Sequence, residues 1–123
     1  YRMLKSATPG RYTFILEATK EVPRRLQHPK RSTIGLRVPE HTVVAALLAE
    51  LNEPILSMTL QLPGDEYPLN DPEDILDRIG NRIDVMLDSG FCGIESTTVV
   101  DLTGPMPELL RRGSGDVKPL GFD

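Results

Sequence analysis

The sequence predicts a mixed α/β sheet in one domain that spans residues 1–123. Runs rich in Val, Ile, Thr and aromatic residues, which are typical of strands, alternate with two helical patterns. Links of hairpin length near the C-terminal end add antiparallel pairs to this arrangement. The length of 123 residues, of which 39% are hydrophobic, suits one domain with a core. Aromatic residues are scarce, so we expect that core to be aliphatic.

The first third of the chain is expected to alternate helix and strand. In order, we expect the end of a helix at 2–5, a strand at 12–16, a helical turn at 23–28, a strand at 33–38 and a helix at 41–52. The 41–52 helix has the clearest pattern, with one apolar face made of Val43, Val44, Leu47, Leu48 and Leu51. Because the chain opens without Met on an apparent helix already under way, we expect a natural N-terminal part to precede it.

The rest of the chain is expected to contain one more helix and four strands. Asp71 as N-cap, Pro72 at the first helical position and acidic residues in the first turn predict a helix that buries Ile75 and Ile79, with Ile83 as a further candidate. The expected strands are residues 55–62, 83–87, 98–102 and 109–111.

Charge is distributed unevenly along the chain. Residues 1–37 carry nine Lys or Arg and two acids, about +7, whereas residues 38–123 carry five basic and sixteen acidic residues, about −11. Basic residues cluster at Lys20, Arg24, Arg25, Lys30 and Arg31. Such a cluster indicates either a phosphate or nucleic-acid contact surface or a solvated connector. A single cysteine fits a reducing compartment, so we expect a cytoplasmic protein, and no apolar run approaches the about 18 residues of a membrane span.

Several kinds of catalytic or metal site lack support in the sequence. His28, His41 and Cys92 are too few for a zinc cluster, and neither a phosphate-binding P-loop nor a dinucleotide glycine motif occurs. We expect His41 to be a capping or surface residue and Cys92 to be a small packed residue. We therefore assign neither a catalytic residue nor a metal ligand.

Polar residues at strand ends are the best binding candidates. Ser96, Thr97 and Thr98 come just before the strand residues Val99 and Val100. Hydroxyls donate and accept hydrogen bonds, so they suit phosphate oxygens or amino-acid head groups, although a solvent-facing run of strand-forming threonines is the alternative. Four further spots could meet them where ligands gather in α/β sheets: residues 9–13, 57–61, Arg37 and Arg111. A buried cation such as Arg37 requires a ligand anion or an ion pair.

Five motifs in order resemble the YrdC family, which includes the threonylcarbamoyl-AMP synthases. They are Pro9-Gly10-x-x-Thr13, Gly35-Leu36-Arg37-Val38-Pro39-x-His41, Leu56-Ser57-x-Thr59, Glu95-Ser96-Thr97-x-Val99-Val100-Asp101 and Leu110-Arg111-x-Gly113. Residues 20–26 and 115–119 look like the YciO branch. The resemblance implies a twisted, mostly open sheet flanked by helices, with a positively charged concave cavity, and the chain would be a partial YrdC-like domain.

The resemblance also implies chemistry. Family synthases join L-threonine, bicarbonate and ATP, with magnesium, into threonylcarbamoyl-AMP and pyrophosphate, and the threonylcarbamoyl group then modifies tRNA. By this similarity the nucleotide would contact Thr13, Arg37, Ser57, Thr59, Gln61 and Arg111. Ser96, with Thr97 as its neighbour, would contact threonine, and tRNA or double-stranded RNA would contact Arg24, Arg25, Lys30 and Arg31.

Two departures from the family pattern keep a second function open. Gln61 stands where synthases usually carry Asn, and the family's N-terminal Lys-x-Arg motif has no counterpart in this chain. The resemblance therefore leaves two expectations, a synthase-like nucleotidyltransferase or a nucleotide- or RNA-binding protein without synthase activity.

Overall fold

The computed structural model describes residues 2–123, which separate into two compact units. The first, here called the sheet unit, contains residues up to Glu40 together with Ser96–Asp123. The second, here called the inserted unit, is His41–Glu95. The assignment of residues 1–123 to one domain stays a prediction.

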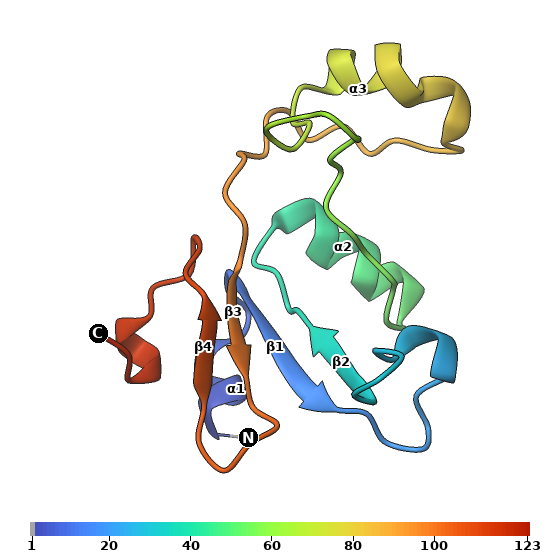
Figure 1. Cartoon of the computed structure of the whole chain (residues 1–123). Helices are drawn as coiled ribbons and strands as arrows, with labels where there is room; N and C mark the ends of the chain where they lie inside the picture. Colours follow the sequence, from blue (N-terminus) through green and yellow to red (C-terminus); the bar gives the residue numbers. More distant parts are fainter. Residues whose placement is uncertain (1) are drawn as a thin grey trace. The chain divides into compact units, whose positions relative to one another are not determined.

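A four-stranded sheet forms the sheet unit (Figure 1). It consists of β1 (Tyr12–Glu17), β2 (Thr33–Leu36), β3 (Thr98–Asp101) and β4 (Glu108–Arg111), in the spatial order β2-β1-β3-β4. β1 pairs antiparallel with β2 and parallel with β3, and β3 pairs antiparallel with β4. The predicted mixed, open sheet is confirmed, and four of the predicted strands form it.

The strand register divides the side chains between two faces of this sheet. Phe14 pairs with Val100 across the β1–β3 ladder, and Thr13 pairs with Val99. Because successive strand residues point to opposite faces, Phe14 and Val100 share one face while Thr13 and Val99 share the other. Phe14 and Val100 are fully buried, whereas Thr13 and Val99 are half-buried. The Phe14 side is therefore the core face, and we call the Thr13 side the open face.

The core face is covered by the two ends of the chain. Phe14, Val100 and Leu120 form the buried cluster, and helix α1 (Arg2–Ala7) adds Met3, Leu4 and Ala7. The turn η3 (Lys118–Leu120) supplies Leu120 and lies against α1. The expectation of a purely aliphatic core is wrong at its centre, because Phe14 is among the largest fully buried side chains and its ring lies 5.7 Å from that of Tyr12.

The basic segment connects β1 to β2. It contains one short 3-10 turn, η1 (Arg24–Leu26), where a helical turn was predicted. Ala18 N donates to Ser32 O, which joins the two ends of the connection. His28 N donates to Thr33 O, which closes the turn before β2. Its basic side chains remain exposed at Lys20, Arg24, Arg25, Lys30 and Arg31.

The inserted unit contains the two predicted helices, α2 (Thr42–Leu51) and α3 (Pro72–Ile79), followed by the turn η2 (Gly80–Arg82). The predicted N-cap is confirmed, since the Asp71 carboxylate accepts a hydrogen bond from Glu73 N. Ile79 is buried as predicted, and Ile75 is half-buried. No helix within residues 2–123 is long and apolar enough to cross a membrane.

Two predicted strands, 55–62 and 83–87, are wrong. Neither segment pairs with a strand among the described residues, and several of their apolar side chains stay exposed, with Leu56 at 81%, Met58 at 87% and Val85 at 75%. The strand pattern is present in the sequence, but a strand needs a neighbour to pair its backbone N–H and C=O groups. Part of segment 55–62 bonds locally instead, from Gln61 N to Thr59 O and from Leu69 N to Leu60 O.

Candidate functional site

Thr13, Thr97 and Arg111 meet on the open face of the sheet. The hydroxyls of Thr13 and Thr97 lie 2.7 Å apart. The Arg111 guanidinium donates from Nε and Nη2 to the Thr97 carbonyl, at 3.0 and 2.8 Å, and from Nη2 to Thr97 Oγ1 at 3.2 Å. We call these three residues the hydroxyl–guanidinium cluster. It joins residues 84 positions apart and supplies one cation with two hydroxyls.

Neighbouring strands and two glycines fix this cluster. Thr13 lies on β1, Thr97 just before β3 and Arg111 at the end of β4, and Arg111 pairs with Val99 of β3. A Cβ atom at Gly113 would overlap the carbonyl oxygens of Ser96 and Thr97, so only glycine lets β4 leave the sheet this close to β3. A Cβ at Gly35 would lie 3.3 Å from Thr13 Cγ2. The close approach of the backbone therefore requires glycine at position 113, whereas the contact at position 35 is only tight.

Ser96 and Arg37 also belong to the sheet unit. Ser96 is exposed, and its carbonyl accepts from Ser114 N at 2.8 Å, which fixes its backbone and leaves its hydroxyl available. Arg37 follows β2 and is exposed rather than interrupting a buried strand. Among residues 2–123, no acid lies within 4.0 Å of its guanidinium. The choice between an ion pair and a ligand anion for Arg37 stays a prediction.

The predicted nucleotide edge lies in the inserted unit. Ser57, Thr59 and Gln61 occupy the irregular segment before α3 and are exposed. The Gln61 amide donates to Asp65 O at 3.0 Å. The predicted convergence of this edge with the sheet-unit residues stays a prediction.

An ion pair anchors the loop that holds Gln61. Arg78 of α3 donates from Nη1 and Nη2 to the two Asp65 carboxylate oxygens, at 3.0 and 3.1 Å. These hydrogen bonds, together with the charge of Arg78, lower the pKa of Asp65, and Asp65 in turn raises the pKa of Arg78. The Gln61 side chain therefore bonds to the backbone of Asp65, the residue whose carboxylate Arg78 of α3 holds.

Two acids flank the sheet in ways that the sequence did not indicate. The Asp101 carboxylate accepts from Thr103 Oγ1 at 2.6 Å and Thr103 N at 2.8 Å. These bonds, with a smaller contribution from Arg31, lower the pKa of Asp101. On the other side, the exposed Arg11 and Glu40 form an ion pair at 2.8 Å.

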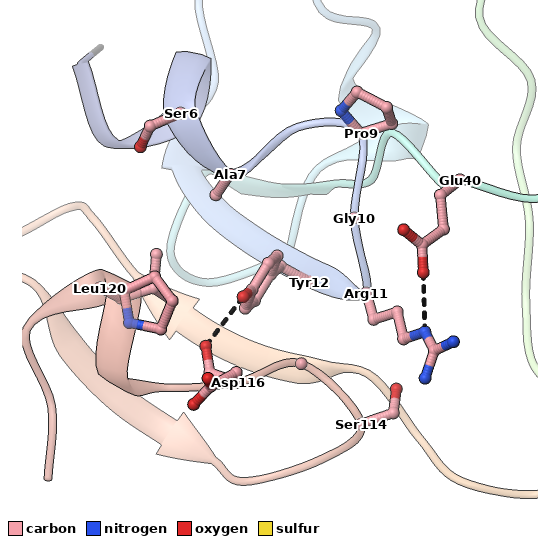
Figure 2. Close-up of a pocket in the computed structure, with 12 residues that line it drawn as sticks. Ser6, Ala7, Pro9, Gly10, Arg11, Tyr12, Glu40, Ser114, Asp116 and Leu120 are labelled. Atoms are coloured by element: carbon pink, nitrogen blue, oxygen red, sulfur yellow. Dashed lines mark hydrogen bonds and ion pairs between the residues drawn. The ribbon is translucent and has the colours of Figure 1, made fainter.

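A pocket of about 470 Å³ lies beside Tyr12, on the core side of the sheet unit (Figure 2). Its walls include Arg11, Glu40 and Asp116, and the Tyr12 hydroxyl donates to Asp116 O at 2.8 Å. Burial, followed by the charges of Asp116 and Glu40, raises the pKa of Tyr12. Pro9, Gly10, Arg11 and Tyr12 of the predicted spot at residues 9–13 line this pocket. Thr13 of the same spot faces the open side instead, as the alternation of side chains along a strand requires.

Cys92 is exposed, so the prediction of a packed cysteine is wrong. Its Sγ lies 3.4 Å from Ser89 Oγ and 4.0 Å from His41 Nε2. His41 begins α2 as its N-cap by backbone position, without a side-chain capping bond. Within residues 2–123, no group of three or more His, Cys, Asp or Glu side chains could hold a metal ion.

Comparison with known proteins gives consistent matches over nearly the whole chain. The family described as Sua5_yciO_yrdC, telomere recombination, matches residues 1–113. YciO of Escherichia coli (strain K12) is 52% identical over 119 residues, and its crystal structure superimposes with a TM-score of 0.88 over 96% of this chain. This chain spans 58% of the length of that relative.

More distant matches carry functional names. A threonylcarbamoyl-AMP synthase of Pyrococcus abyssi is 31% identical over 113 residues, which are 90% of this chain and 32% of that protein. The crystal structure of P. abyssi Sua5 complexed with L-threonine has a TM-score of 0.83 at 25% identity, covering 97% of this chain and 35% of that one.

Proposed function

Because the chain belongs to the Sua5/YciO/YrdC family, we propose that its protein binds ATP and L-threonine and forms threonylcarbamoyl-AMP for tRNA modification. The resemblance inferred from the sequence, including its YciO character, is confirmed by the 52% identity. The match to a P. abyssi synthase supports the reaction, and the P. abyssi Sua5 complex supports threonine as a ligand. The single cysteine supports a cytoplasmic location.

The hydroxyl–guanidinium cluster is the observation that carries this proposal. Forming an acyl-adenylate places negative charge on phosphoryl and carbamate oxygens, and fixed donors and cations stabilise that charge. Arg111 supplies a guanidinium that β3 already holds in place, with the Thr13 and Thr97 hydroxyls beside it. The cluster contains no carboxylate, so in this proposal magnesium enters with ATP as part of the substrate.

The remaining predicted residues have complementary roles in this proposal. Arg37 adds an exposed cation, and Ser96 offers its exposed hydroxyl to threonine. Ser57, Thr59 and Gln61 provide the nucleotide edge from the inserted unit. The Gln61 amide donates one N–H to Asp65 O, and its second N–H and its carbonyl oxygen are available to a ligand in this proposal.

Pyrophosphate release tests the proposal. The purified protein should release pyrophosphate from ATP only when L-threonine and bicarbonate are both present. Arg111→Gln should lower this rate by tenfold or more because it removes the fixed cation. Thr19→Val, an exposed change on the same unit, serves as the control. Release that does not depend on threonine would reject the reaction.

A second candidate function is RNA binding without synthesis. It rests on the exposed basic segment between β1 and β2, where Arg24 and Arg25 sit on η1. Cations that neutralise phosphates release counterions, so binding to tRNA or double-stranded RNA should weaken steeply as salt rises. Arg24→Ala with Arg25→Ala should lower affinity and reduce the salt slope by about 2.

A matched control makes this test specific. Arg82 and Lys118 are exposed basic residues outside the segment, so their double substitution by Ala removes the same charge elsewhere. If both double variants lose the same affinity, only net charge matters and the segment is no RNA site.

A further inference from the structure

We infer that Thr13, Thr97 and Arg111 form a directed hydrogen-bond chain that holds an anionic oxygen of the ligand, with Thr97 as a positioning residue. This inference rests on the proposed function and deepens it. Sequence reasoning placed Thr97 beside Ser96 as a contact to threonine. The geometry points to a different role, in which Thr97 contacts Arg111 and Thr13 and acts through both.

The first step concerns the guanidinium. Arg111 donates hydrogen bonds from Nε and Nη2 to the Thr97 carbonyl, and Nη2 also donates to Thr97 Oγ1. A guanidinium has five N–H donors, and these contacts occupy the Nε and Nη2 side of the fork. Among residues 2–123, no acceptor engages Nη1. One edge of the guanidinium is thus fixed to Thr97, just before β3, and the other edge offers two free donors.

The second step concerns the direction of the hydroxyl bonds. Arginine can only donate, so Thr97 Oγ1 accepts from Arg111 Nη2. A hydroxyl that accepts from a cation becomes a stronger donor, because successive hydrogen bonds polarise one another. The 2.7 Å distance between Thr97 Oγ1 and Thr13 Oγ1 fits donation in either direction, and this polarisation favours donation from Thr97 to Thr13. The Thr13 proton is then free to donate outward.

These steps define the ligand chemistry. The free groups are the two N–H donors of Arg111 Nη1, on the β4 side of Thr97, and the Thr13 hydroxyl, on its β1 side. Such a set matches an anionic oxygen, which a nucleotide phosphate and an amino-acid carboxylate share. The neighbouring Thr98 hydroxyl is not part of this donor set, because it lies on the core face and donates to Gly115 O.

Titration calorimetry with AMP, inorganic phosphate and L-threonine tests the chain. Thr97→Val should weaken binding of the anion that occupies the cluster by about tenfold, the effect of one hydrogen bond to a charged group. Thr97→Ser keeps the hydroxyl and should stay within about twofold of the unsubstituted protein. Thr19→Val makes the same chemical change at an exposed site and should have no effect.

A second comparison separates positioning from direct contact. If Thr97 acts through its two neighbours, Thr97→Val should cost nothing more in a protein that already carries Thr13→Val and Arg111→Gln. Preferred binding of AMP and phosphate assigns the oxygen to a phosphate, and preferred binding of L-threonine assigns it to a carboxylate. Either preference, together with the Thr97 pattern, supports the inference.

Three results would overturn the inference: equal affinities of Thr97→Val and the unsubstituted protein, a full loss from Thr97→Val in the doubly substituted protein, or no binding of AMP, phosphate or L-threonine. The proposed reaction fails by a different measurement, the threonine- and bicarbonate-dependent release of pyrophosphate. Anion binding with the expected Thr97 pattern but without that release would reject the reaction and retain the hydrogen-bond chain.

Discussion

The Thr98 hydroxyl ties the C-terminal loop to the sheet, and Thr98→Val tests how much stability this tie provides. Thr98 is fully buried, and its Oγ1 donates to Gly115 O at 2.6 Å and accepts from Gly113 N at 3.0 Å. Valine has nearly the same shape and an equally high preference for strands. The substitution therefore removes the two hydrogen bonds and changes little else.

The expected loss of stability depends on whether the two groups that lose their hydrogen bond, the Gly115 carbonyl and the Gly113 N–H, are buried or exposed. Gly115 is buried, so its carbonyl would be left without a partner, at a cost of about 1–3 kcal/mol. Gly113 is exposed, so its N–H can turn to water at a cost of about 0.5 kcal/mol. Burial of the Val methyl group that replaces the hydroxyl stabilises the folded protein by up to about 0.8 kcal/mol. The net expectation is a loss of about 1–3 kcal/mol in the free energy of unfolding.

Urea unfolding followed by far-UV circular dichroism measures this loss as a lower midpoint at an unchanged slope. Thr19→Val is the matched control because Thr19 is exposed, and it should change the free energy by less than about 0.5 kcal/mol. If Thr98→Val loses no more than this control, the reasoning about the buried carbonyl is wrong.

Three further predictions address other parts of the fold. Asp71→Ala removes the N-cap acceptor for Glu73 N and should cost about 1 kcal/mol, seen in urea unfolding; unchanged stability would contradict the capping role. Gly113→Ala should cost more than about 1 kcal/mol and shift the amide NMR signals of β3, because its Cβ would overlap backbone oxygens; an unperturbed spectrum would contradict the close approach. Arg78 lowers the pKa of Asp65, so the stability from this pair is present above about pH 4 and is lost as pH falls through the lowered pKa. Arg78→Gln should return the Asp65 pKa toward its ordinary value in an NMR titration, and an unmoved pKa would refute the assignment.

Local sequence patterns correctly predicted two kinds of element. One is a helix whose capping interactions lie within its own first turn, and the other is a strand that finds partner strands among the described residues. The α3 start could be predicted because Asp71 and Pro72 act on their own helix. Strand β3 could be predicted because Val99 and Val100 have strong strand preference and find β1 and β4 as neighbours. Segments 55–62 and 83–87 have the same preference but no partner strand among residues 2–123, and propensity cannot reveal whether a partner exists.

The site was predictable in part for a similar reason. The ordered motifs selected Thr13, Thr97 and Arg111, and the parallel and antiparallel pairings bring them together. The sequence could not show that Thr97 faces Arg111 rather than solvent, because that contact depends on the register between β3 and β4, including its irregularity at Val99 and Val100. Exposure of Arg37 was also unpredictable, since β2 ends one residue earlier, at Leu36.

The split of the sheet unit around the inserted unit has a consequence for folding on the ribosome. β1 and β2 are synthesised early, but β1 pairs with β3, which follows only after residues 41–95. A two-stranded hairpin alone is marginal in water, so β1 and β2 must wait for the later strands. The inserted unit is continuous in sequence and can order its helices in the meantime, whereas the sheet must close a long loop, which slows folding. The hydroxyl–guanidinium cluster can therefore form only after Arg111 has emerged from the ribosomal exit tunnel, when all four strands are available.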